Sequence, residues 1–228
     1  MTFRNSIDAF IESLHRHPEP AVFNPWYQTD PSNDIDGGGS IIRRRQLRQY
    51  FLEREDSVKY LLIAEALGYQ GGHFSGMAMT SERILLGHKS SDGVQPEQVF
   101  RNLEPERTSK PSVKANGFSE NTATTVWTTL AEFGIDTYEI VLWNTFPWHP
   151  FEPDSGMLTN RTPTRDELEY AQPYLEDFLA LFPECTIVAL GNHSSDNLTS
   201  LGIEHTKLRH PSFGGAPKFR AGLEQIVH

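Results

Sequence analysis

The chain has 228 residues, of which 20 are basic and 30 acidic, so its formal net charge is -10. Hydrophobic residues make up 37% of it and aromatic residues 11%, which is enough for a packed core and argues against wholesale disorder. The single cysteine, Cys185, excludes a disulfide scaffold, a cysteine-rich zinc site and a Cys-ligated iron–sulfur cluster. The acidic balance argues against a protein that coats a polyanion.

The length suits one α/β core. We predict a single domain over residues 1–228, in which residues 1–56 form N-terminal helices and a loop packed on the core. No apolar run approaches the roughly 20 residues that span a bilayer, so we expect no membrane partner. The first residues lack the apolar stretch of a secretory signal, and we therefore expect a cytoplasmic protein. We also expect a monomer.

The first quarter of the chain predicts two helices joined by a loop. Apolar residues at helical spacing indicate a helix over 5–14. The segment 17–39 is rich in Pro, Asn, Asp and Gly, but its aromatic residues favour a packed loop over a linker. A second helix is predicted over 40–54, with an arginine-rich face.

Alternating strands and helices are predicted after residue 57. The first apolar run, 60–66, is typical of a buried parallel strand. A polar stretch over 88–118 then predicts a surface excursion, and Ser119 is expected to cap a helix over 120–133. The remaining elements are predicted strands at 139–144, 186–190 and 204–208 and helices at 164–182, 194–201 and 217–226. This order predicts an α/β fold whose central parallel four-stranded sheet carries helices on both faces.

Polar clusters follow all four predicted strands. They occupy residues 65–72, 144–150, 191–193 and 210–215. Ligands of open α/β sheets bind beyond the carboxyl ends of the strands, so we predict that these clusters converge on one site. A polar turn at a single strand end would carry little weight, since such turns also occur without a function.

Three side chains in these clusters suit chemistry on a polar ring. Glu65 can orient or deprotonate a water molecule. The amide of Asn144 offers donors and an acceptor to an imide or amide edge. His210 precedes Pro211, where a rigid turn fixes its ring. The structural alternatives are a turn hydrogen bond for Glu65, a loop amide for Asn144 and a buried ring for His210. The turn after the first strand is also predicted to line the pocket, through Gly68, Tyr69 and Gln70.

These residues resemble the motifs of the uracil-DNA glycosylase superfamily. The turn Ala-Glu-Ala-Leu-Gly at 64–68 is similar to the family's first motif, and Gly-Met-Ala-Met-Thr-Ser-Glu at 76–82 resembles its Gly-x-Pro-Phe-Thr-Ser-Glu segment. The stretch 142–150 resembles the asparagine-bearing strand end, and His-Pro-Ser at 210–212 resembles the closing loop. The ordered match runs from about residue 57 to residue 224, in a branch without an iron–sulfur cluster.

The resemblance implies an enzyme that extrudes a damaged base from DNA and hydrolyses its glycosidic bond. Glu65 then stands where the family positions the attacking water, and Asn144 reads the base. His210 stabilises negative charge on the departing base. The stretch Phe213-Gly214-Gly215 enters the gap left in the duplex. No metal or organic cofactor is implied.

The chain departs from the family pattern at Ala64, Leu67 and Met79, where Gly, Pro and Phe are common. The aromatic residue that stacks on the base is therefore missing from its usual place. The sequence offers Phe74 or Phe146 as substitutes, and Met79 itself can pack against a base.

Eight of the 20 basic residues lie in two acid-free segments, 39–52 and 205–220. They predict a small, salt-sensitive DNA footprint that includes Arg43, Arg44, Ser212 and Lys218. A solvated helix face is the alternative for the arginines.

Three functions remain open from the sequence. The first is a monofunctional DNA glycosylase, a hydrolase acting on uracil or another deaminated base in DNA as part of base excision repair. The second is a non-catalytic nucleic-acid or nucleotide-binding module that retains the fold, which the departures from the motifs favour. The third is an enzyme acting on a small nucleoside, which the acidic net charge favours.

Overall fold

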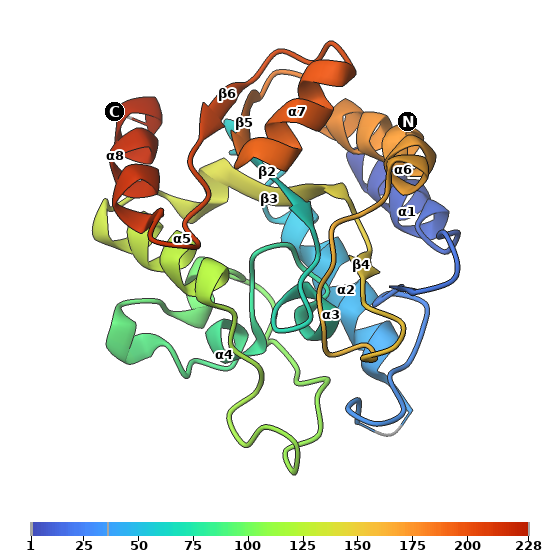
Figure 1. The fold of residues 1–228 in the computed structure, drawn as a ribbon. Coiled ribbons are helices and arrows are strands. Elements are labelled where there is room, and N and C mark those ends of the chain that lie inside the picture. The colour runs from blue at the N-terminus through green and yellow to red at the C-terminus, as the bar shows by residue number, and fades with distance from the viewer. Residues whose placement is uncertain (1, 36, 228) are drawn as a thin grey trace.

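The computed structural model describes residues 2–35 and 37–227. At its centre lies a parallel sheet of four strands in the order β3-β2-β5-β6 (Figure 1). The strands are β2 (Tyr60–Ala66), β3 (Ile140–Phe146), β5 (Thr186–Leu190) and β6 (Thr206–Leu208). The predicted α/β class and parallel four-stranded sheet are therefore confirmed.

The two central strands are buried because helices cover both of their sides. Leu62 of β2 lies between Leu142 of β3 and Val188 of β5 in the register of the sheet. All three side chains are almost completely buried. A strand buried on both faces has no solvated side to make polar, which explains why the sequence shows apolar runs instead of alternation.

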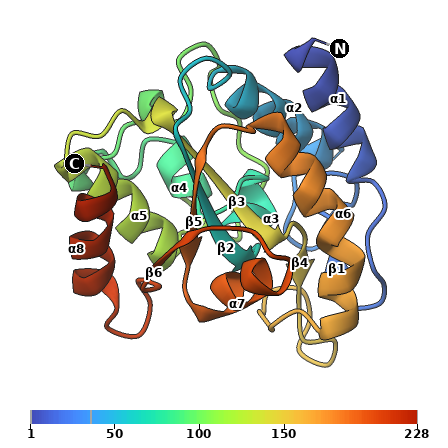
Figure 2. The same ribbon diagram turned by 90° about the horizontal axis from the view of Figure 1, so that it is seen from above.

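Helices cover the two faces of the sheet (Figure 2). One side carries α1 (Phe3–Ser13), α2 (Gly39–Leu52) and α6 (Arg165–Leu181). The opposite side carries α5 (Asn121–Glu132) and α8 (Ala216–Val227). The helix α7 (Asn192–Ser200) follows β5 and packs against the sheet. Shorter elements are α3 (Gly72–Ser75), α4 (Glu82–Leu85) and the 3-10 turns Ser90–Asp92, Pro96–Gln98 and Thr137–Glu139.

An aromatic cluster joins the N-terminal helices to the sheet. Trp143 of β3 stacks on Phe178 of α6, with ring centroids 4.8 Å apart and planes 14° from parallel. Phe10 of α1 contacts the same indole edge-on at 5.6 Å, and Phe51 of α2 contacts it at 5.6 Å. Each such aromatic side chain contributes about 1.5–3 kcal/mol by its burial. The helices α1 and α2 therefore share the core of the sheet.

The structure differs from the sequence-based expectation in two local features. Ser119 was expected to cap α5, but the N-cap residue is Glu120, which has extended backbone angles and makes no side-chain capping bond. A two-residue antiparallel pair, β1 (Val22–Phe23) and β4 (His149–Pro150), was not predicted. Strands of two residues are too short to produce a periodic pattern.

The connectivity creates a switch point between β2 and β5. The chain passes from β2 to β3 on one side, and the next strand of this sheet, β5, lies on the other side of β2. Crevices for ligands form where the strand order reverses in this way, outside the carboxyl ends of the strands. Among the described helices, none is long and apolar enough to cross a membrane.

Candidate functional site

Several cavities open near the carboxyl ends of the central strands, and two of them are bordered by both Glu65 and His210. The inner cavity, of about 180 Å³, is bordered by residues that include Glu65, Gly68, Met79, Glu120, Asn160 and His210. The outer cavity, of about 480 Å³, is bordered by residues that include Glu65, Asn160, His193, His210, Ser212 and Phe213. Sites for drug-sized ligands measure about 300–1,000 Å³, so the inner cavity suits a smaller group such as one ring system.

Glu65 lies near the end of β2 and borders both cavities. Burial raises the pKa of its carboxyl group, while the nearby His193 and a hydrogen bond with Thr162 act in the opposite direction. His193 Nδ1 lies 3.8 Å from Glu65 Oε1. A carboxylate whose pKa is raised, at the mouth of a cavity, is suited to holding a water molecule and accepting its proton.

His210 follows β6, and its ring is held by the next turn. Ser212 donates its backbone N–H to His210 Nδ1 over 3.2 Å, and Ser212 Oγ lies 2.7 Å from the same atom. Since Nδ1 accepts, the proton of the neutral ring resides on Nε2. Burial and the charge of Arg209 lower the pKa of His210. The ring is therefore a neutral donor at the junction of the two cavities.

Asn144 lies on β3, opposite Ala64 of β2. Ala64 borders the inner cavity, whereas Asn144 lies on the neighbouring strand and is not part of the lining of that cavity. Its side chain is 1% exposed, and neither Oδ1 nor Nδ2 has a hydrogen-bond partner in the described part of the chain. A buried polar group without a partner costs about 1–3 kcal/mol. Such a group is a candidate for contact with a ligand.

Some of the residues predicted to contact a base border the inner cavity, and others lie in the turn after β2. Gly68 and Met79 border the inner cavity, and Met79 has a left-handed backbone with φ of 46°. Tyr69 and Gln70 lie in the turn after β2, where the Tyr69 N–H donates to Asn160 Oδ1 over 2.9 Å.

Phe74 was predicted to contact the base, but its ring borders neither of the two cavities. Its ring is fully buried and stacks on Phe118 with centroids 4.0 Å apart. Phe146, the other candidate, is also fully buried and packs edge-on against Trp148. Both aromatic residues belong to the core, which leaves Met79 as the apolar side chain at the inner cavity among the three candidates.

The loop after His210 carries an exposed apolar tip. Phe213 is 97% exposed and has a left-handed backbone with φ of 50°, followed by Gly214 with φ of 73°. Lys218 is exposed on the first turns of α8. Phe213 borders the outer cavity, so this tip is a candidate for contact with a ligand that occupies that cavity.

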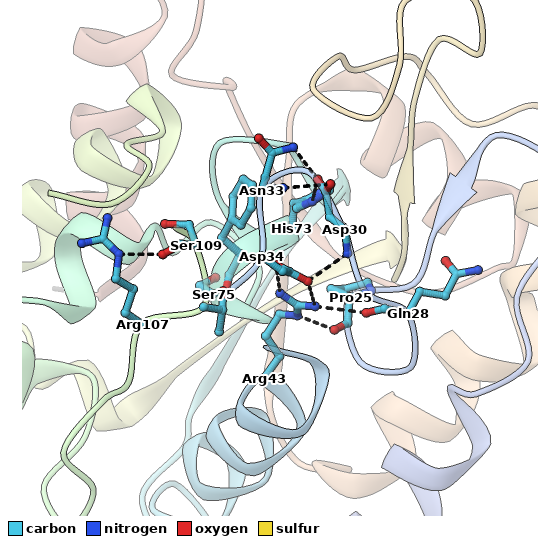
Figure 3. A network of polar contacts seen from close by, with 12 residues as sticks. Pro25, Gln28, Asp30, Asn33, Asp34, Arg43, His73, Ser75, Arg107 and Ser109 are labelled. Atoms are coloured by element: carbon cyan, nitrogen blue, oxygen red, sulfur yellow. Dashed lines mark hydrogen bonds and ion pairs between the residues drawn. The ribbon is translucent and has the colours of Figure 1, made fainter. Parts of the chain in front are cut away.

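Arg43 was predicted to contact DNA, and the structure contradicts this. Its guanidinium group is fully buried and binds both oxygens of Asp34, at 2.8 and 2.9 Å (Figure 3). It also donates to the backbone carbonyl groups of Pro25 and Gln28. A buried ion pair with its hydrogen bonds satisfied is held in place, since breaking it would leave an uncompensated charge. Arg43 thus connects Pro25, Gln28 and Asp34 to α2.

Arg44 is half-buried, and its side chain already has partners. Its guanidinium group donates to the carbonyl of Trp26 and lies 4.4 Å from the centroid of the Tyr27 ring. A contact between Arg44 and DNA remains a prediction.

Two polar residues of the inner cavity were missed by the sequence-based reasoning. Glu120 comes from the start of α5, and burial raises its pKa to about 7. Asn160 comes from the loop before α6 and accepts the hydrogen bond from Tyr69. Neither residue follows a strand, so the rule that selected Glu65 and His210 passed over them. Within residues 2–35 and 37–227, no group of three or more His, Cys, Asp or Glu side chains is arranged to hold a metal ion.

Comparisons with known proteins identify the family and the fold of the chain. The family model described as the uracil DNA glycosylase superfamily matches residues 65–224. No curated protein matches the chain. The crystal structure of wild-type SMUG2 from Pedobacter heparinus has the same fold, with a TM-score of 0.67 and 13% sequence identity, and the alignment covers 99% of this chain and 98% of that chain. Because the family match extends over more than half of the sequence, the chain belongs to the uracil DNA glycosylase superfamily.

Proposed function

We propose that the protein is a monofunctional DNA glycosylase, which flips uracil or another deaminated base out of DNA and excises it by hydrolysis. The observation that carries this proposal is that Glu65 and His210, from different strand ends, border the same inner cavity. One is a carboxylate suited to a water molecule, and the other is a neutral donor suited to a departing base. Membership of the superfamily supports the same reaction.

In the proposed reaction, the base occupies the inner cavity and its sugar lies toward the outer one. As the glycosidic bond breaks, the sugar becomes cationic and the base anionic. His210 donates its Nε2 proton in a hydrogen bond to the base, where one such donor is worth about 2.7–4 kcal/mol in the transition state. Glu65 orients a water molecule for attack on the sugar and accepts its proton.

Asn144 is the proposed reader of the base. Its two amide atoms lack partners in the described chain, and a lactam edge would supply one donor and one acceptor to them. Since the side chain lies one strand from the inner cavity, contact requires the wall at Ala64 and Met79 to shift when the base enters. The unpaired amide then recovers about the free energy that its burial costs.

Phe213 is the proposed wedge that fills the gap in the duplex. Its full exposure and left-handed backbone at a loop tip suit insertion between base pairs. Lys218 supports the proposal as an exposed cation on the following helix.

The proposal is tested by release of free base from oligonucleotides that contain uracil, hypoxanthine or xanthine. We expect release from at least one of them, and a decrease of about 100-fold or more in the His210→Ala and Asn144→Ala variants. The exposed His15→Ala variant is the matched control. Absence of release from all three substrates by folded protein would overturn the proposal.

A second candidate is a binding module that has lost the reaction. The observation that favours it is Met79, an aliphatic side chain at the inner cavity where the family usually provides an aromatic ring. This candidate predicts salt-dependent binding to single-stranded or damaged DNA without an abasic product. Base release that depends on His210 would eliminate it.

A further inference from the structure

The carboxyl group of Glu120 lies against the turn that follows β2. A Cβ atom added to Gly68 would lie 3.0 Å from Glu120 Oε1, and one added to Gly71 would overlap Oε2. At both positions the absence of a side chain leaves room for this carboxyl group, which comes from a distant helix and packs against the backbone of the turn. The turn of the first family motif and the start of α5 together form this wall of the inner cavity.

One oxygen of this carboxyl group has no partner. Glu120 Oε2 is buried and accepts no hydrogen bond from any described residue. The ionisable side chains that share the inner cavity with it are Glu65, Arg161 and His210. Arg161 does not neutralise it, since its guanidinium group binds both oxygens of Glu167 at 2.6 and 2.7 Å. Glu120 thus borders the cavity, and no cationic side chain of the cavity lining pairs with its carboxyl group.

The charge state follows from this environment. Burial raises the pKa of Glu120 to about 7, from an ordinary value of 4.5. Near neutral pH the carboxylic acid, which both donates and accepts a hydrogen bond, is therefore populated here. Burial raises the pKa of Glu65 as well, but His193 at 3.8 Å and a hydrogen bond with Thr162 oppose that rise, whereas burial alone acts on Glu120. The two carboxyl groups of one cavity are thereby suited to opposite roles.

We propose that Glu120 contacts the extruded base in its protonated form and donates a hydrogen bond to an exocyclic carbonyl oxygen. This inference rests on the proposed function and deepens it. Deamination replaces an amino group of a base with a carbonyl oxygen, so a donor at this position favours deaminated bases. An ionised Glu120 would repel the same oxygen, on which negative charge grows as the bond to the sugar breaks. The proton remains on Glu120 throughout.

The test is the pH dependence of single-turnover base release between pH 5.5 and 9, on whichever oligonucleotide the wild type cleaves. For the wild type we expect the rate constant to fall about tenfold per pH unit above pH 7. Glu120→Gln keeps a donor of the same size, so it should stay within about tenfold of the wild type at pH 6 and lack this decrease. Glu120→Ala removes the donor and should be about 100-fold slower at pH 6.

A second variant displaces the carboxyl group without removing it. Gly71→Ala puts a methyl group where Glu120 Oε2 now lies, and Gly71 does not have a left-handed backbone. We expect a folded protein with slower release and without the decrease above pH 7. Circular dichroism and thermal unfolding check each variant, and comparison on one substrate cancels the ionisation of the substrate itself.

Two outcomes would overturn the role of Glu120. The first is a Glu120→Ala variant with the rate and pH profile of the wild type. The second combines two results: Glu120→Gln is as slow as Glu120→Ala at pH 6, and the wild-type rate rises through pH 7. Together they would indicate that an ionised Glu120 acts as a proton acceptor instead. Both outcomes leave the glycosylase proposal intact.

A separate measurement decides the inference if the wild type releases no base. Binding of an oligonucleotide that contains non-hydrolysable 2′-fluoro-2′-deoxyuridine needs the base pocket but no bond cleavage. Affinity that decreases above pH 7 in the wild type and not in Glu120→Gln would support the contact even though the proposed reaction had failed. Equal affinity of the wild type and Glu120→Ala at pH 6 would overturn it.

Discussion

The Nδ1 atom of His73 lies 2.9 Å from the Nδ1 atom of His149, inside a buried chain of polar groups. His149 Nε2 lies 2.7 Å from the carbonyl oxygen of Thr159, which only accepts, so Nε2 carries the proton and Nδ1 accepts from His73. The other nitrogen of His73 faces Asp30 Oδ2 at 3.1 Å. His73 and Asp30 therefore share one proton and form a pair of zero net charge. The chain of contacts ends beside Asn160, a residue of both cavities.

Removal of His73 should destabilise the protein strongly. His73→Ala leaves the buried carboxyl group of Asp30 without this partner, and breaking a buried pair costs about 3–5 kcal/mol. Urea denaturation at pH 7 measures the difference. His15→Ala, at an exposed ring, should change the free energy of unfolding by less than about 0.5 kcal/mol. Equal midpoints for the two variants would contradict the role assigned to His73.

Lowering the pH from 6.5 to 4.5 should decrease the free energy of unfolding of the Glu120→Gln variant. This variant is used because the side chain at position 120 then does not titrate. Burial, and next to it His73, lowers the pKa of His149 to about 3 from 6.5, so the unfolded chain takes up a proton in this range and the folded one does not. The lowered pKa of His210 acts in the same direction, and the raised pKa of Glu65 opposes it. Urea midpoints at pH 6.5, 5.5 and 4.5 measure the balance. A midpoint that rises on acidification would contradict a buried, neutral His149 ring.

Glu120→Gln should be more stable than the wild type at pH 8. The pKa of Glu120 is about 7 in the folded state, above the ordinary 4.5. The protonated side chain therefore contributes to the free energy of unfolding fully below pH 4.5, and this contribution is lost as the pH rises through 7. One pH unit corresponds to about 1.4 kcal/mol, which gives a difference of at most about 3 kcal/mol at pH 8. The difference should vanish near pH 4. Denaturation at both pH values measures it, and a variant that is less stable at pH 8 would contradict the burial of the charge.

Ser212 should act as a positioning residue for His210. Ser212→Ala removes the hydroxyl group 2.7 Å from His210 Nδ1 and leaves the backbone bond at 3.2 Å. We expect kcat of base release to fall about tenfold with KM nearly unchanged, since the ring loses orientation and the base loses no direct contact. The exposed Ser200→Ala is the control. A variant with altered KM alone would indicate that Ser212 contacts DNA instead.

Phe213→Ala should weaken the reaction on duplex DNA more than on single strands. Only the duplex has a gap to fill after the base leaves the stack. We expect release from duplex to fall about tenfold, with release from single strands and thermal stability nearly unchanged. Ile41→Ala, at an exposed apolar residue of α2, is the matched control. Equal losses on both substrates would argue against a wedge.

The strands and long helices of the fold followed from local patterns. The apolar runs at 60–66 and 186–190 coincide with β2 and β5, because burial on both faces leaves a continuous signal. The strand-end rule also selected Glu65 and His210, since the carboxyl ends of parallel strands meet at one edge. These predictions needed only information within about ten residues of chain.

The missed features depend on contacts between distant segments. In the sequence, Arg43 belongs to a run of arginines that is typical of a solvated helix face. Its burial depends on Asp34, which lies in a loop without a periodic pattern of apolar residues. Phe74 lies close to the first motif, but its ring packs on Phe118, from the far end of the polar excursion. Glu120 becomes a site residue only because Gly71, from a turn 49 residues earlier, leaves space for its carboxyl group. No single segment carries these signals.

The most direct measurement is the formation of alkali-labile abasic sites in a 5′-labelled duplex that contains one uracil, one hypoxanthine or one xanthine. The wild type should convert at least one of these duplexes to the cleaved product, with free base released in equal amount. His210→Ala, folded and as stable as the wild type, should convert it about 100-fold more slowly. Binding of all three duplexes without an abasic product would contradict the account.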